Sequence, residues 1–184
     1  MILVVAATEV ELAATGAGYG LCCGIGPAEA GIRTAMALAG DRPDAVLHVG
    51  IAGAPDLEPL SVAIGAEAFY CDIGDPSSIV PRVEVAFPDT ALLEAAQRAL
   101  PDAKVLPIAT CSKVGGGQGF EVEAMEGFSV LRACELAGVP AVEVRVISNS
   151  PTEVDRSRWR FEDAFARLGE IVPLLLEELE PCVR

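Results

Sequence analysis

Short apolar runs of strand length alternate along this chain with segments that have the spacing of amphipathic helices. The strand-like runs occupy residues 2–6, 21–25, 45–49, 64–70, 104–109 and 141–147. The helix-like segments occupy residues 27–39, 90–100, 126–137 and 157–180. Strands that alternate with helices favour a largely parallel sheet covered on both faces. We therefore expect an α/β protein, a three-layer α/β/α sandwich with a largely parallel, mixed central sheet, formed by residues 1–184 as a single domain.

The first helix-like segment shows how these elements are delimited. Pro27 stands in its first turn, where the missing N–H of proline is not needed. Ile32, Met36 and Ala39 are expected to supply its apolar face. Other signals are a helix cap at Asp89, a helix stop at Gly138 and Pro140, a kink at Pro173, a loop or edge strand over residues 76–88, and a glycine-rich loop over residues 114–119.

Composition narrows the class of protein. Hydrophobic residues make up 52% of the 184 residues and the mean hydropathy is +0.43, but no apolar run approaches the ~20 residues of a membrane span. The apolar residues 1–7 lack the basic n-region of a signal peptide and lead directly into Glu9 and Glu11. We therefore expect a buried first strand and not a signal peptide. A net charge of −14 without a basic face argues against nucleic-acid binding.

The cysteine and histidine content argues against a metal site. None of the six cysteines forms a C-x-x-C motif, and His48 is the only histidine. We therefore expect no zinc site, and free thiols in the reducing cytoplasm. Cys22, Cys23 and Cys134 lie in apolar runs, as buried thiols do. His48 lies inside an apolar strand and is expected to be a structural core residue, which leaves Ser/His and Cys/His catalysis without a base.

Polar residues follow several of the predicted strands. Ligands of parallel α/β sheets bind beyond the carboxyl ends of the strands, so these are the segments in which a site is expected. Each residue alone has an ordinary structural role: Glu11 and Glu126 suit the start of a helix, Asn149 suits a cap, and Gly50 and Gly53 suit a tight turn. No Gly-x-Gly-x-x-Gly follows the first strand, which argues against a dinucleotide-binding oxidoreductase.

Taken together, five stretches resemble the nucleoside phosphorylase/nucleosidase superfamily, and within it the branch of the methylthioadenosine nucleosidases and futalosine hydrolases. The stretches occur in the family's order, at residues 7–11, 24–26, 50–53, 125–127 and 145–149. Two combinations of segments resemble the futalosine hydrolases in particular. The first is Met125–Gly127 with Asn149, and the second is Asp72–Gly74 with the later segment 156–160. The resemblance implies a nucleoside phosphorylase-like fold and hydrolysis of futalosine, an inosine-like nucleoside, to hypoxanthine on a menaquinone route.

The resemblance also implies a role for each matching residue. Glu11 corresponds to the carboxylate that activates water, and Glu126 to the carboxylate that binds the ribose hydroxyls. Asn149 offers a donor for O6 and an acceptor for a protonated N7, which predicts hypoxanthine over adenine. The remaining substrate contacts are expected from Met125 on the ribose, from Val114 on the loop along the base, and from Ile51 and Gly53.

Some positions differ from the pattern of the family, and alternative functions therefore have to be considered. The chain is shorter than its relatives in a first hairpin near residues 15–20 and between Gly119 and Glu121, where relatives carry a helix over the purine. Ile51 stands where phosphorylases carry a serine that helps hold phosphate, which favours water as the nucleophile. The alternatives are a purine nucleoside phosphorylase, a methylthioadenosine/adenosylhomocysteine nucleosidase, and a degenerate nucleoside-binding homologue. The resemblance further implies a homodimer or larger homo-oligomer that needs no metal or organic cofactor.

The arginine-rich segment 156–160 has two possible interpretations. Arg156, Arg158 and Arg160 are either surface residues at a helix start, with Trp159 in the core, or one of them binds a carboxylate on the substrate.

Overall fold

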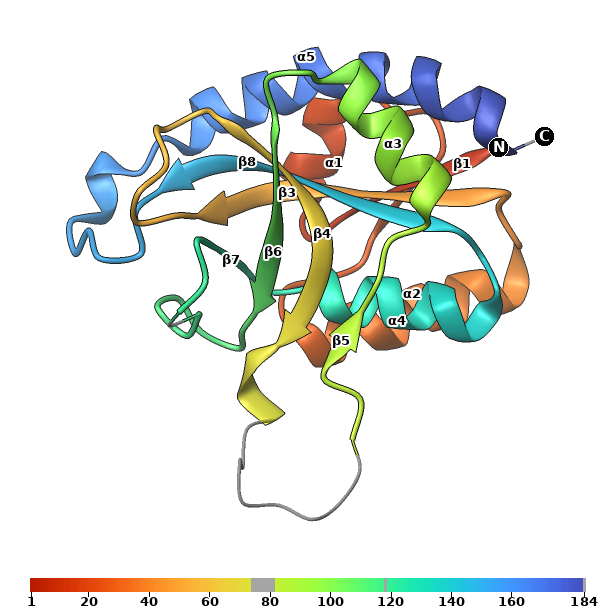
Figure 1. Ribbon diagram of the computed structural model, residues 1–184, viewed down its shortest axis with the longest axis horizontal. Helices are drawn as coiled ribbons and strands as arrows, with labels where there is room; N and C mark the ends of the chain where they lie inside the picture. The colour runs from red at the N-terminus through yellow and green to blue at the C-terminus, as the bar shows by residue number, and fades with distance from the viewer. Residues whose placement is uncertain (74–81, 118, 184) are drawn as a thin grey trace.

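A mixed sheet forms the middle layer of the molecule (Figure 1). The computed structural model describes residues 1–73, 82–117 and 119–183. Within them the sheet contains eight strands: β1 (Ile2–Ala6), β2 (Gly20–Cys22), β3 (Ala45–Gly53), β4 (Val62–Tyr70), β5 (Val85–Ala86), β6 (Lys104–Thr110), β7 (Val122–Ala124) and β8 (Ala141–Asn149).

The order of the strands brings distant parts of the chain to one edge. Strands β2, β1, β3 and β8 run parallel side by side, β8 pairs antiparallel with the start of β4, and β6 runs parallel to β4. Strand β7 pairs with β6 and also, through Gly53 and Glu123, with the end of β3. The carboxyl ends of β1, β3 and β8 therefore meet at one edge, and β7 closes the sheet on itself there.

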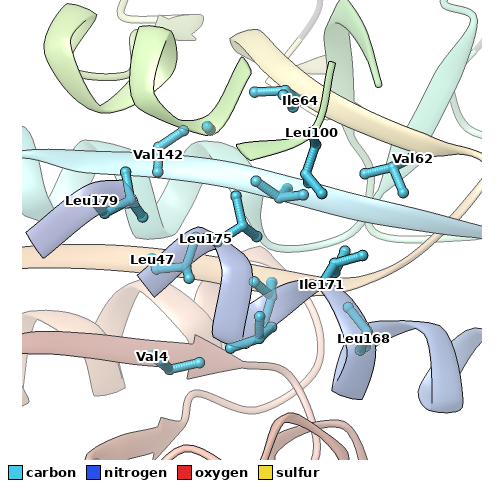
Figure 2. Packing of buried hydrophobic residues seen from close by; sticks show 14 of the residues in the cluster. Val4, Leu47, Val62, Ile64, Leu100, Val142, Leu168, Ile171, Leu175 and Leu179 are labelled. Atoms are coloured by element: carbon cyan, nitrogen blue, oxygen red, sulfur yellow. The ribbon is translucent and has the colours of Figure 1, made fainter. Parts of the chain in front are cut away.

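Helices cover both faces of the sheet, as Figure 1 shows. Helices α1 (Glu9–Thr15), α3 (Thr90–Ala99) and α5 (Phe161–Leu179) lie on one face, and α2 (Pro27–Gly40) and α4 (Gly127–Ala137) lie on the other. Alternate residues of the strands point to opposite faces. Val4 and Leu47 pack under Ile171 and Leu175 of α5 (Figure 2), whereas Val5 packs with α2 and α4.

The architecture confirms the predicted fold class. The α/β/α layers and the largely parallel, mixed sheet are those expected. The predicted helix cap is also present, because Asp89 accepts hydrogen bonds from the N–H groups of Ala91 and Leu92 at 2.9 and 3.1 Å. The helix stop at Gly138 is confirmed by its left-handed conformation, with φ of 65°.

The predicted apolar face of α2 is wrong. Ile32 and Met36 are 59% and 70% exposed, and Ala39 is exposed as well. The inner face instead follows the spacing Ala30, Thr34 and Leu38. Helix α2 packs on α4 there, and a Cβ on Gly31 would stand at van der Waals distance, 3.4 Å, from Ser129. Apolar residues occur on more than one side of α2, so their spacing alone does not fix which side faces the core.

Three further features differ from the prediction, and the predicted edge strand is confirmed in the described part of its segment. No hairpin forms near residues 15–20, because β2 is parallel to β1 and the unpredicted helix α1 connects them. Strand β2 ends at Cys22, where Gly24 and Gly26 with φ of 82° and 89° turn the chain into α2. Helix α5 begins at Phe161 and not at residue 157, and residues 156–158 form a separate 3₁₀ turn. Within the segment 76–88, residues 76–81 lie outside the described residues and Val85–Ala86 forms the edge strand β5.

Candidate active site

A cavity of about 400 Å³ opens at the edge where β1, β3, β7 and β8 end. A volume of this size suits a small organic ligand. Its wall consists mostly of apolar side chains and contains a few polar ones. Among the lining residues are all seven predicted site residues: Glu11, Ile51, Gly53, Val114, Met125, Glu126 and Asn149.

Glu11 is held by the first turn of α1 and by β3. Thr8 caps α1, and its N–H and hydroxyl donate to Glu11 Oε2 at 3.0 and 2.7 Å. The N–H of Ile51 donates to Glu11 Oε1 at 3.1 Å. Only glycine fits at position 50, because a Cβ there would lie 2.9 Å from this same Oε1. A carboxylate that is 4% exposed thus faces the cavity in one fixed orientation.

Glu126 lies between the N-termini of α2 and α4. Its Oε1 accepts the N–H of Gly26 at 3.1 Å, and its Oε2 lies 3.5 Å from Nη2 of Arg145. Burial raises the pKa of Glu126, and the Arg145 cation and the Gly26 N–H partly offset that rise. The buried cation therefore favours the ionised form of this acid.

Arg145 is the largest fully buried side chain among the described residues, and three groups surround it. Its Nε donates to Glu143 at 2.8 Å, and its Nη2 contacts both Glu126 and Nε2 of His48. Burial alone would lower the pKa of Arg145, but the carboxylates of Glu143 and Glu126 raise it above its usual value. A positive charge thus stays in the core directly behind the cavity.

His48 is a structural core residue, as predicted. It is fully buried, and its Nδ1 lies 3.0 Å from the carbonyl oxygen of Val5. Burial and the adjacent Arg145 cation lower the pKa of His48 well below its ordinary value. The ring is therefore neutral, with a proton on Nδ1 for Val5 and a lone pair on Nε2 for Arg145.

Asn149 ends β8 at the cavity wall. Its Oδ1 accepts a hydrogen bond from Ser148 at 2.9 Å, and a Cβ on Gly53 would lie 3.3 Å from its Nδ2. The amide is thus oriented by its neighbour, and the close approach of β3 explains why glycine occupies position 53. The two N–H donors of the amide and one remaining acceptor lone pair of Oδ1 are available to a ligand.

Three aromatic side chains form a further part of the wall. Trp159, Phe161 and Phe165 line the cavity, with Trp159 and Phe161 in edge contact at 5.5 Å. The indole N–H of Trp159 donates to the carbonyl of Glu153 at 3.2 Å, which fixes the ring. The guanidinium of Arg156 lies over the same ring, 5.3 Å from its centre. Trp159 is therefore not a core residue.

Several lining or supporting residues were not predicted, although two of them left a signal. Glu143 and Arg145 alternate within an otherwise apolar strand, and a pair of charges on one face of a central strand indicates a buried ion pair. Glu123 and Phe161 gave no comparable signal. The place of Glu123 in the cavity depends on the pairing of β7 with the end of β3, and that of Phe161 depends on where α5 begins.

Neither a metal centre nor a membrane helix is found in the part of the chain that is described. No three His, Cys, Asp or Glu side chains there come together in a way that would hold a metal ion. No helix within residues 1–73, 82–117 and 119–183 combines the length and hydrophobicity that crossing a membrane requires.

Comparison with known proteins places the chain in a family. Residues 7–179 match the phosphorylase superfamily, and the chain belongs to it. A futalosine hydrolase of Streptomyces coelicolor is 33% identical over an alignment of 186 positions, which covers 87% of this chain and 79% of that protein. The structure of a futalosine hydrolase of Helicobacter pylori superposes with a TM-score of 0.85 at 17% identity and covers 97% of each chain. An S-adenosylhomocysteine nucleosidase of Streptococcus pyogenes gives 0.83 at 18% identity and 97% and 96% coverage. The two structural matches establish the fold alone.

The buried state of His48 predicts a pH-dependent stability. The unfolded chain takes up a proton near pH 6.5, whereas burial and Arg145 oppose protonation of the folded state. The free energy of unfolding should therefore fall as the pH decreases below about 6.5, by at most about 1.4 kcal/mol per pH unit. Urea unfolding at pH 7.5 and 5.5 measures this loss.

The His48→Gln variant is the control for this measurement. His48 is the only histidine, so the variant removes the effect of histidine entirely. The raised pKa of Glu126 acts in the opposite sense, because the folded state then binds a proton first, but it is present in both proteins. Equal losses of stability in both proteins would contradict the assignment.

Proposed function

We propose that this protein is an N-glycosyl hydrolase that cleaves a purine nucleoside, with futalosine as substrate and hypoxanthine as the released base. The observation that carries the proposal is the convergence of Glu11, Glu126 and Asn149 on one cavity, from three separate elements of the fold. The curated relatives named futalosine hydrolase support the choice of substrate.

The first step of the reaction needs a base. Cleavage of a ribosyl–purine bond proceeds through an oxocarbenium-like state, as in glycoside hydrolysis. Glu11 accepts a proton from a water molecule as the oxygen of that water bonds to C1′ and the bond from C1′ to the purine breaks. Its two fixed hydrogen-bonding neighbours, Thr8 and Ile51, hold the carboxylate without moving during the step.

The ribose is held by Glu126 and its neighbours. The carboxylate of Glu126 accepts hydrogen bonds from the 2′- and 3′-hydroxyls, and its negative charge stabilises the positive charge that develops on the sugar. Met125 packs against the ribose, and Ile51 and Gly53 complete the wall beside it. Arg145, which touches Glu126 but does not line the cavity, supplies the countercharge for the acid.

The leaving base is recognised by Asn149. The purine must leave as a neutral molecule, so N7 takes up a proton from solvent as the bond breaks, and Glu11 later returns to solvent the proton that it removed from the attacking water. The amide oxygen of Asn149 accepts a hydrogen bond from the protonated N7. The amide N–H donates to O6 of a 6-oxopurine, whereas the 6-amino group of adenine would present a donor to a donor. Val114 packs along the base from the opposite loop.

One of the three arginines suits an anionic substituent of the substrate. Arg158 pairs with Glu153 at 3.0 Å and Arg160 with Asp163 at 2.8 Å. Among the described residues Arg156 forms no such pair and instead lies over Trp159, which lines the cavity. We infer that Arg156 is the arginine that binds the benzoate carboxylate of futalosine.

Three other properties belong to the same proposal. The protein acts without metal or organic cofactor, in the cytoplasm, as its free thiols favour. It forms a homodimer or larger homo-oligomer, to which the exposed Ile32 and Met36 of α2 offer an apolar contact surface. Light scattering measures the mass, and a monomer at all concentrations would contradict this part.

The alternative reactions differ in their requirements. A phosphorylase needs phosphate beside C1′, where the apolar side chain of Ile51 offers no hydrogen bond. A methylthioadenosine or adenosylhomocysteine nucleosidase must accept a 6-amino group, which Asn149 disfavours. A degenerate homologue would bind hypoxanthine but release none from the nucleoside.

Replacing Glu11 separates chemistry from binding. The Glu11→Gln variant keeps an oxygen for hydrogen bonding but loses the base, so turnover should fall by at least about 10²-fold. The affinity for futalosine, measured by calorimetry, should change less than about threefold. Equal losses of turnover and affinity would make Glu11 a structural residue.

Replacing Asn149 tests the selection of the base. In the Asn149→Asp variant, a protonated carboxyl group can donate to N7 while its other oxygen accepts from a 6-amino group. The substitution should therefore shift the ratio of kcat/KM between futalosine and its 6-amino analogue toward the analogue by about tenfold or more. An unchanged ratio would refute the role of this amide.

Replacing each arginine with alanine tests the anion contact. Arg156→Ala should raise the KM for futalosine by about tenfold and leave that for inosine unchanged, because inosine lacks the carboxylate. Arg158→Ala and Arg160→Ala serve as matched controls with an unchanged KM for both. If all three variants behave alike, the arginines are surface residues.

A further inference from the structure

A second carboxylate at the cavity, Glu123, makes contacts that the proposed chemistry does not use. Glu123 lies on β7, is 9% exposed and lines the cavity. Its Oε1 accepts the N–H of Gly115 at 2.6 Å, and its Oε2 accepts the N–H of Gly117 at 2.9 Å. Both oxygens therefore point toward the backbone of the glycine-rich loop.

The same loop has two more attachments. The N–H of Ser112 donates to a carboxylate oxygen of Asp72, which follows β4. The N–H of Cys111 donates to the carbonyl of Ala124 at 3.0 Å, beside Glu123. We call residues 111–117 the clamped loop. Hydrogen bonds attach the start of this loop to the segment after β4 and to β7, and attach its later residues to Glu123.

The clamped loop fits closely against its supports. A Cβ on Gly117 would lie 2.8 Å from the Cβ of Glu123, and one on Gly116 would lie 2.8 Å from the Cβ of Cys111. Side chains at either position would push the loop outward. The glycines and the carboxylate therefore act together. The glycines allow the loop to approach β7, and the carboxylate of Glu123 supplies the hydrogen-bond acceptors.

The clamped loop presents one side chain to the ligand. Val114 stands directly before Gly115 and lines the cavity, although its side chain is otherwise exposed. Its position depends on the hydrogen bond of the next residue to Glu123. Charge-assisted hydrogen bonds are about twice as strong as neutral ones, so loss of the carboxylate charge would free Val114 from the wall.

We propose that Glu123 is a positioning residue, which sets the affinity for the nucleoside by holding the clamped loop and Val114 against the cavity. The proposal rests on the proposed function for its ligand and on the observed contacts for its mechanism. A contact made alike to substrate and transition state changes KM and leaves kcat unaltered.

The kinetic test compares Glu123→Gln with Asp89→Asn. An amide group at position 123 keeps one acceptor but opposes a backbone N–H with another N–H, so the KM for futalosine should rise about tenfold while kcat stays within about threefold. Asp89 also accepts two backbone N–H groups, but at the start of α3, away from the cavity. Asp89→Asn should therefore leave KM and kcat unchanged.

A second readout needs no catalysis. The chain has two lysines, Lys104 in β6 and Lys113 in the clamped loop. A lysine-specific protease should cut after Lys113 at least about fivefold faster in Glu123→Gln than in the natural protein or in Asp89→Asn, because a loop must open before a protease can bind it. The products are residues 1–113 and 114–184.

A variant of the second tether covers the case in which Glu123→Gln does not fold. Asp72 is exposed, so Asp72→Asn should fold and should also accelerate the cut after Lys113. The proposal is overturned if neither variant accelerates the cut, or if Glu123→Gln lowers kcat with an unchanged KM. If futalosine is not hydrolysed at all but the cut is accelerated, the proposed function fails and the clamp stands.

Discussion

A buried positive charge is the constraint around which this site is built. Arg145 lies in the core between Glu143, Glu126 and His48, and an arginine so buried is tolerated only with partners on every side. Removing one member of such a group leaves an uncompensated charge and typically costs about 3–5 kcal/mol. The neutral His48 fills the remaining side without adding a second cation. One consequence reaches the cavity: Arg145 counteracts the rise that burial causes in the pKa of Glu126.

The topology of the sheet explains why residues so far apart in sequence act together. Strands β1, β3 and β8 run parallel, so the segments that follow them meet at one edge (Figure 1). Strand β7 closes the sheet against the end of β3 and brings Glu123, Met125 and Glu126 to the same place. Glycines at positions 50 and 53 allow the functional side chains to approach the backbone of β3. The chemistry therefore depends on short backbone distances as much as on the acids themselves.

The sequence predicted the parts of the structure that follow from local pattern. The layers follow from strands that alternate with helices, and the place of Glu11 and Asn149 follows from the rule that ligands bind beyond strand ends. The inner face of α2 was predicted wrongly, because apolar residues occur on more than one side of this helix and their spacing does not distinguish the inner residue Leu38 from the exposed Ile32 and Met36. The roles of Glu123 and of the aromatic residues Trp159, Phe161 and Phe165 in the cavity wall were not predicted. Their positions depend on how β7 closes the sheet and on where α5 begins. No local spacing carries that information.

The measurement that tests the account most directly is the release of base from futalosine in buffer free of phosphate. Base and sugar products are separated and identified by mass, with and without added phosphate. The account predicts hypoxanthine and a free, unphosphorylated sugar at a rate that phosphate does not change. Release only when phosphate is present, with a phosphorylated sugar as product, would contradict it and assign the site to a phosphorylase.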